Sequence, residues 1–174
     1  MKTKFEELIG QQEAALKRKF TDIPNFGTPI DEHDSNFRWS IDEKLGLKTI
    51  PELVEIRTRG VDNGVMCAIQ LVWEGGIESP VFDCGRDVDP IRSVRLDGSK
   101  IRRIISNSHS EHGYADEIRI EHDNGSQQTI FTKGRKSFDE QVREIAANQR
   151  IVGLYGRLLV GGNVRYLGFI VADQ

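Results

Sequence analysis

An all-β fold is predicted by three features of this 174-residue chain. Glycine is frequent, with 17 residues, whereas proline occurs only five times. Apolar runs of strand length alternate with turn-forming pairs over most of the chain. The length suits one domain with a substantial core plus an extension. The turn-forming pairs are Asn63-Gly64, Gly75-Gly76, Asp97-Gly98, Asn124-Gly125 and Gly161-Gly162.

Residues 1–20 differ from the rest and predict an amphipathic helix, because their apolar side chains recur at helical spacing. An isolated helix of this length is marginal in water, so the stripe needs a surface to cover. That surface is either the rest of the chain or another protein. In the second case, the partner-binding residues would be Phe5, Leu8, Ile9, Leu16 and Phe20.

An extended linker is predicted to follow the helix. Residues 21–34 carry two prolines and a glycine among acidic residues, a composition typical of an extended segment crossing a surface. The pattern of residues 37–41 then predicts a short aromatic strand or anchor. We therefore place a helical arm and linker at 1–35 and a β domain at 36–174.

The middle of the chain contains two similar strand-turn-strand units, at 68–83 and 117–132. Their common layout indicates a faint internal repeat. A prism of three similar Greek-key sheets would leave such a repeat, and a sandwich of seven or eight strands is the alternative.

One segment breaks the strand pattern. Ser137 and Glu140 have the spacing of a capping box, and Phe138, Val142 and Ile145 share one helical face. This segment predicts a helical turn or short helix between strands.

The chain ends in a predicted hairpin. Two apolar runs, 151–157 and 164–171, flank Gly161-Gly162, and glycine supplies the positive φ that a tight reversal needs.

This last segment resembles the closing segment of the jacalin-related lectins. The likeness rests on the I-x-G-x-x-G-R pattern of 151–157, the glycine turn and the L-G-F of 167–169. It extends in family order over residues 50–174, through the strand at 53–57 and the hairpins named above. The resemblance implies a β-prism of three Greek-key sheets and a scaffold that binds sugars.

The resemblance also places the sugar site and shows how it departs from the family. Members usually carry a G-x-x-x-D loop before the last strand, but Arg165 stands where the aspartate is expected. A guanidinium only donates hydrogen bonds and prefers carboxylate or phosphate, so altered specificity, such as for acidic sugars, is expected. Alternatively, Asp173 supplies the carboxylate. The glycine-rich loop of the family is reduced to 84–87. The ligand-binding residues implied are Gly161, Gly162, Asn163, Val164, Arg165, Gly85, Arg86 and Asp87.

No motif supports catalysis or a cofactor. The sequence has neither a phosphate-binding glycine loop nor a nucleophile elbow, so we predict that the protein is not an enzyme. The stretch 108–117 gathers two histidines and three carboxylates, but it lacks the spacing of a zinc motif. We predict a solvated polar loop there and no metal.

Composition sets the expected compartment. The net charge of −3 gives no reason to expect nucleic-acid binding. No signal peptide or bilayer-spanning run is recognisable, which favours an intracellular, cytoplasmic protein. Cys67 and Cys84 are expected to be reduced, because disulfide-stapled secreted domains usually carry more cysteines.

Two functions remain open from the sequence. The first is a non-enzymatic protein-interaction or structural subunit, attached to a larger assembly through the arm at 1–35. The alternative is a carbohydrate-binding lectin whose specificity is altered.

Overall fold

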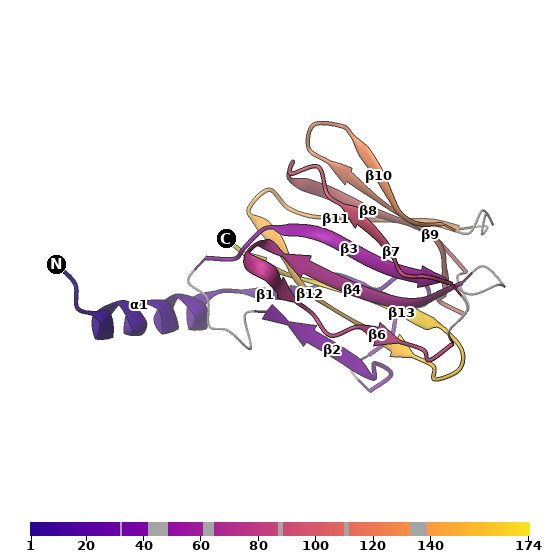
Figure 1. The fold of residues 1–174 in the computed structure, drawn as a ribbon, viewed down its shortest axis with the longest axis horizontal. Helices are drawn as coiled ribbons and strands as arrows, with labels where there is room; N and C mark the ends of the chain where they lie inside the picture. The colour runs from indigo at the N-terminus through magenta and orange to yellow at the C-terminus, as the bar shows by residue number, and fades with distance from the viewer. Residues whose placement is uncertain (32, 42–48, 61–64, 87–88, 110–111, 133–138) are drawn as a thin grey trace.

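The computed structural model of the chain describes residues 1–174 apart from 32, 42–48, 61–64, 87–88, 110–111 and 133–138 (Figure 1). Three antiparallel sheets surround one apolar core in these residues. The predicted all-β, three-sheet architecture is confirmed, and the two-sheet sandwich is wrong. The predicted turn at Asn63-Gly64 lies outside the described residues.

The predicted helix is present as α1 (Lys4–Lys17). Thr3 and Glu6 form a reciprocal capping box: the Thr3 amide donates to Glu6 Oε2 (2.9 Å), and the Glu6 amide donates to Thr3 Oγ1 (3.2 Å). The helix extends away from the sheets at one side of the molecule (Figure 1).

Sheet B is a Greek key. Its main strands lie in the order β5-β4-β3-β7, and numbered by their sequence these four strands have the order 3-2-1-4. A short additional strand, β6, pairs with β4. The strands are β3 (Leu53–Gly60), β4 (Met66–Trp73), β5 (Ile77–Glu78), β6 (Phe82–Asp83) and β7 (Arg92–Arg95).

Sheet C repeats this topology in the order β10-β9-β8-β11. Its second strand begins at Ala115 and that of sheet B at Met66, 49 residues earlier. The internal repeat read from the sequence therefore corresponds to two equivalent Greek keys. The strands are β8 (Ile101–Ser108), β9 (Ala115–His122), β10 (Gln127–Thr132) and β11 (Asp139–Glu144).

Sheet A joins the two ends of the chain in the order β1-β13-β12-β2. The C-terminal hairpin forms its centre, as predicted, and the two N-terminal strands form its edges. If numbering starts at β12, continues to β13 and then passes to β1 and β2 at the other end of the chain, the strand order is again 3-2-1-4. The strands are β1 (Phe20–Asp22), β2 (Phe37–Ser40), β12 (Gln149–Leu158) and β13 (Val164–Asp173).

The expected linker takes part in this sheet. Thr21 pairs with Val171 in β13, and the side chains of Ile23 and Phe26 are buried in the core. The segment at 20–35, assigned from sequence to the arm and linker, thus contributes a strand and core residues to the sheets. The composition of the segment, with its prolines, glycine and acidic residues, could not reveal these distant partners.

The helix predicted around 137–145 is wrong. Residues 139–144 form β11, whose residues pair one by one with β8 from Asp139 opposite Ser108 to Glu144 opposite Arg103. The unpaired edge of β8 provides backbone partners that outweigh a weak local preference for helix. Ser137 and Phe138 lie outside the described residues.

Long side chains connect the sheets through the core. Trp73 of sheet B is fully buried and donates its Nε1–H to the Ile151 carbonyl of sheet A (3.0 Å). Thr58 of sheet B donates its hydroxyl to the Ile130 carbonyl of sheet C (3.3 Å). These bonds satisfy polar groups in an otherwise apolar interior.

Candidate functional site

The first predicted sugar loop forms the turn between β12 and β13. Gly161 has a φ of 74°, so the turn uses a conformation that glycine adopts without strain. The Leu159 amide donates to the Asn163 carbonyl (3.0 Å), and the Gly162 amide donates to the Leu159 carbonyl (2.9 Å). Asn163 is buried, and Val164 begins β13.

The second predicted loop lies against the first. The Gly161 amide donates to the carbonyl of Cys84, the residue before Gly85. The Gly85 amide donates to Asp83 Oδ1 (2.8 Å), and Asp83 pairs with Arg59. The structure therefore brings together the two loops that the sequence predicted as parts of one site, although Asp87 lies outside the described residues.

A third segment completes this end of the molecule. Tyr114 forms a backbone bridge to Arg165, and the Tyr166 amide donates to the Gly113 carbonyl (2.8 Å). The His109 ring lies near the Tyr114 ring, tilted by 41° with the centroids 5.2 Å apart. We define the loop end as the described residues of 84–86, 109–114 and 161–166.

The polar loop predicted at 108–117 is shorter than expected. Ser108 ends β8 and is buried, and β9 already begins at Ala115, so only 109–114 connect these strands. His109 and His112 lie together, with ring centroids 4.5 Å apart. Ser110 and Glu111 lie outside the described residues.

The backbone at the loop end is strained. Tyr166 has a φ of 52°, in the left-handed region that bulky residues rarely adopt. Its ring occupies the space where a Cβ on Gly113 would lie. Strain of this kind costs on the order of 1–3 kcal/mol and tends to occur at functional sites.

The prediction that Cys67 and Cys84 are reduced is wrong. They form a disulfide, with their Cα atoms 5.2 Å apart. The pairing of β6 with β4 places Asp83 opposite Ala68, and the Cys84 amide donates to the Cys67 carbonyl (2.8 Å), so the two side chains become neighbours. Two cysteines 17 positions apart do not reveal this register. Disulfides persist mainly in oxidising compartments, so the bond does not support the expected cytoplasmic location.

The same two cysteines and Asp83 have possible metal-ligand atoms within 4.8 Å of one another. Among the described residues, this is the one cluster of three or more such side chains. Because the sulfur atoms are bonded to each other, they provide no thiolate for a metal. This cluster anchors the loop at 84–86 and is not a metal site in the disulfide form.

Two arginines face each other at the loop end. Arg157 in β12 lies directly opposite Arg165 in β13. Directly opposed residues share a face of the sheet, and like charges in this position destabilise it. The Arg165 Nε–H donates to Asn163 Oδ1 (3.0 Å). This bond uses one of the five N–H donors of Arg165 and orients its guanidinium.

Arg157 was not predicted as a site residue, although a signal was present. The turn is centred on Gly161, so a symmetric hairpin pairs residue 157 with 165.

Asp173, the alternative carboxylate, lies at the other end of β13, opposite Gln149. Eight residues of strand separate it from Arg165, which corresponds to about 26 Å. The alternative alignment is therefore wrong.

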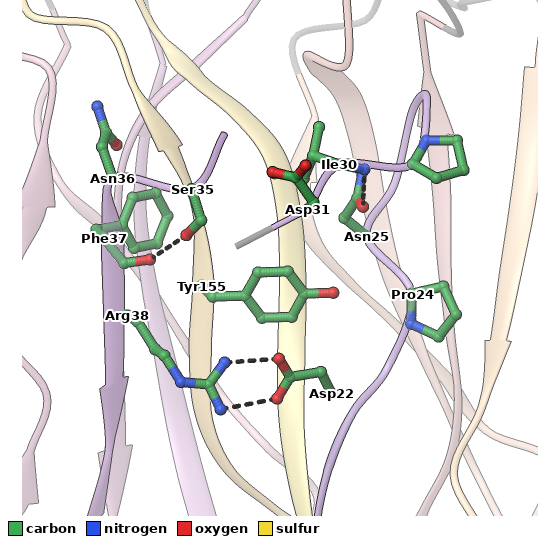
Figure 2. Close-up of a pocket in the computed structure, with 11 residues that line it drawn as sticks. Asp22, Pro24, Asn25, Ile30, Asp31, Ser35, Asn36, Phe37, Arg38 and Tyr155 are labelled. Atoms are coloured by element: carbon green, nitrogen blue, oxygen red, sulfur yellow. Dashed lines mark hydrogen bonds and ion pairs between the residues drawn. The ribbon is translucent and has the colours of Figure 1, made fainter. Parts of the chain in front are cut away.

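A second candidate site is a hollow of about 810 Å³ on sheet A (Figure 2). Strands β1, β2 and β12 and the segment between β1 and β2 line it. Asp22 and Arg38 form a bidentate ion pair, with Nη–Oδ distances of 2.7 and 2.8 Å. No local pattern in the sequence predicts this hollow, because its polar residues are separated by up to 133 positions.

Tyr155 lies between the ion pair and the loop residues in the hollow (Figure 2). Its ring packs on Gly168, where an added Cβ would lie 2.2 Å from Cζ. Its hydroxyl donates to the Ile23 carbonyl (2.5 Å). Burial, and then the negative charge of Asp22, raise the pKa of Tyr155 to about 12, so the phenol remains a neutral donor over a wide pH range.

The predicted partner-binding residues fall into two groups. Phe5, Leu8 and Ile9 on α1 are exposed, with 72, 52 and 41% of their surfaces accessible. The stripe in this part of the helix therefore does not pack on the sheets. Phe20 instead belongs to β1 and packs against the core. The side chain of Leu16 lies outside the described part of the structure.

The sequence matches no protein-family model and no curated protein. Solved structures nevertheless share the fold. A prostate-specific WGA16 glycoprotein lectin superposes with a TM-score of 0.61 at 16% identity, over 83% of this chain and 96% of that one. A mannose-binding jacalin-related lectin from Ananas comosus gives 0.58 at 16% identity, over 89% and 99%. Single-chain recombinant jacalin gives 0.61 at 10% identity, over 90% and 95%.

These similarities show the fold of the chain, which it shares with several lectins. More particularly, it has the jacalin-like β-prism fold that the closing hairpin predicted, with an added N-terminal helix. No helix in the described residues is long and apolar enough to span a bilayer.

Proposed function

We propose that this chain is a carbohydrate-binding protein and that the loop end binds glycans carrying negative charge. The observation that carries this proposal is the opposed pair of Arg157 and Arg165 beside the glycine turn. An anion between the guanidinium groups would relieve their repulsion and accept charge-assisted hydrogen bonds. The sugar loops expected from the resemblance meet at the same place.

The surroundings of Arg165 support this assignment. Its guanidinium is half-buried and is oriented by buried Asn163. Cys84, anchored by the disulfide, accepts the Gly161 amide and fixes the turn. A site that is rigid before binding loses little entropy when the ligand arrives.

The test compares a heparin-derived hexasaccharide with neutral mannotriose by isothermal titration calorimetry at two salt concentrations. We expect the sulfated probe to bind more tightly, with an affinity that falls at higher salt. Arg165→Gln and Arg157→Gln should each weaken its binding about tenfold, because each removes charged hydrogen bonds. Arg102→Gln is the matched control: this arginine is also on a strand, with its side chain 51% exposed, but it lies in sheet C.

Two results would count against the proposal. One is equal binding of the sulfated probe by the wild type and both variants at the loop end. The other is the absence of binding by any sulfated or carboxylated glycan on an array.

A second candidate function is protein docking through α1, and the exposed side chains of Phe5, Leu8 and Ile9 favour it. The test is a truncation that removes only residues 2–17, because Phe20 belongs to the sheet. Loss of a co-purifying protein in this truncation and in Leu8→Asp would support docking.

Glu13→Lys provides the control for that experiment, since it changes charge at an exposed helix position. An unchanged set of co-purifying proteins in the truncated chain would exclude an essential role for the arm. This outcome would leave the glycan proposal untouched, because the loop end contains no residue of α1.

A further inference from the structure

A buried histidine lies at the end of β9 that is far from the loop end, and we propose that it forms a pH-sensitive latch between sheets B and C. None of the His122 side chain is exposed. The latch consists of this ring, the turn at 97–99, the Gln128 side chain and the Arg95 carbonyl. It shares no residue with the loop end, so the inference is independent of the glycan binding proposed above.

Gln128 presents an oxygen to the histidine ring. Its Oε1 accepts the Asp97 amide (3.0 Å), and its Nε2 donates to the Arg95 carbonyl (2.9 Å). Turning the side-chain amide over would place donor against donor and acceptor against acceptor, so these two backbone groups fix its orientation. His122 Nε2 lies 2.8 Å from the same Oε1 and therefore donates to it.

The other ring nitrogen also faces acceptors. Nδ1 of His122 lies 2.8 Å from the Ser99 carbonyl oxygen and 3.3 Å from Asp97 Oδ1. A carbonyl oxygen only accepts, so this nitrogen needs a hydrogen too. A neutral imidazole has one N–H and one lone pair, whereas the imidazolium ion donates from both nitrogens. The site therefore fits the doubly protonated ring.

A carboxylate balances the charge of that ring. Hydrogen bonds from the Ser126 hydroxyl and then the Ser99 amide hold the pKa of Asp97 below its usual value, so Asp97 stays negative beside His122. A buried cation is tolerated when it is paired and hydrogen-bonded in this way. The other charged residues on these segments are exposed or have partners elsewhere: Asp123, Lys100 with the Ala147 carbonyl, Arg95 opposite Glu55, and Glu121 with Arg103.

The proton on this ring connects two sheets. Gln128 belongs to β10 of sheet C, and the carbonyl to which it donates belongs to β7 of sheet B. Loss of the proton turns one ring nitrogen into a lone pair that faces an acceptor in a fully buried site, which is costly. The protonated ring therefore stabilises the latch, and a rise in pH that removes the proton releases the turn at 97–99.

The test is a series of NMR spectra of the isotopically labelled full-length chain between about pH 5 and 9. Long-range proton–nitrogen spectra report the hydrogen on each ring nitrogen, and amide spectra report the turn. We expect both nitrogens of His122 to carry hydrogens at the acid end. The amide signals of Ser99 and Gln128 should shift with the same midpoint as the loss of the ring proton.

Two variants separate the latch from a general effect of pH. His122→Gln should abolish the shared transition, because its side chain does not titrate. Asp97→Asn should lower the midpoint by about one pH unit, since it removes the opposite charge, and it serves alone if His122→Gln does not fold. His33→Gln is the control, because it changes an exposed histidine outside the latch and should leave the midpoint unchanged.

Four results would overturn the inference. The ring could carry a single N–H throughout the series, or both hydrogens throughout it. The ring and the amides of the turn could titrate with different midpoints. Finally, folded Asp97→Asn could have the same midpoint as the wild type.

Discussion

Reduction of the disulfide between Cys67 and Cys84 should destabilise the protein by about 3 kcal/mol. The bond joins residues 17 positions apart. In the chain-entropy treatment, closing a loop of about this length in the unfolded state is worth about 3 kcal/mol at 25 °C. For a chain of this size, that loss corresponds to a fall in the melting temperature of about 6–12 °C.

The assay is urea unfolding of the oxidised and reduced protein, followed by tryptophan fluorescence. Alkylation of the unfolded protein and mass spectrometry report how many thiols are free in each sample. Both cysteines are fully buried, so reduction is performed in urea before refolding. A Cys67→Ala/Cys84→Ala double variant, which cannot form the bond, should match the reduced wild type apart from a small cost for the lost sulfur atoms.

Two results would refute this reasoning. A change in unfolding free energy below about 1 kcal/mol would show that the cross-link does not constrain the unfolded chain as the loop length implies. Two free thiols in protein purified without reductant and kept in air would show that the bond itself does not form.

Three further predictions concern the core and the sheets. Trp73→Phe should cost about 2–3 kcal/mol in urea unfolding, because it removes buried surface and the hydrogen bond to Ile151, and a cost below about 1 kcal/mol would contradict that contact. Gly153→Ala should prevent normal pairing of β12 with β2, since its Cβ would lie 2.0 Å from a carbonyl oxygen of β2, whereas Gly10→Ala in α1 meets no atom within 4 Å and should not lower the melting temperature. Tyr155 has a raised pKa of about 12 in the folded state, so its contribution to stability should be complete below pH about 10 and decline as pH rises towards 12. Absorbance titration of the phenolate checks this, and Tyr155→Phe should lose this part of the pH dependence.

Local signals account for the elements that were predicted correctly. The hairpin of β12 and β13 follows from two apolar runs and a glycine turn, and α1 follows from helical periodicity and the capping box of Thr3 and Glu6. The repeat of sheets B and C left a spacing of 49 residues in the sequence. These features depend on residues that are close along the chain or on regular spacing, so they can be read without the fold.

The errors arose where distant partners overrode local preference. Residues 139–144 carry a helical pattern, yet the free edge of β8 makes them a strand. The pairing of β6 with β4 brings Cys84 to Cys67, and neither strand shows that register by itself. Residues 21–34 looked like a linker because the partner of β1 lies about 150 residues away in β13.

The sequence by itself determined the fold class, the closing hairpin and the loop that carries Arg165, because turn chemistry and periodicity are local properties. It also contained the pairing of Arg157 with Arg165, through the symmetry of the turn. Only the tertiary structure decided that both chain ends build sheet A, and hence that Asp22, Arg38 and Tyr155 meet in one hollow. The physical reason is that these side chains come from three strands of one sheet, and the order of strands is set by packing around the common core.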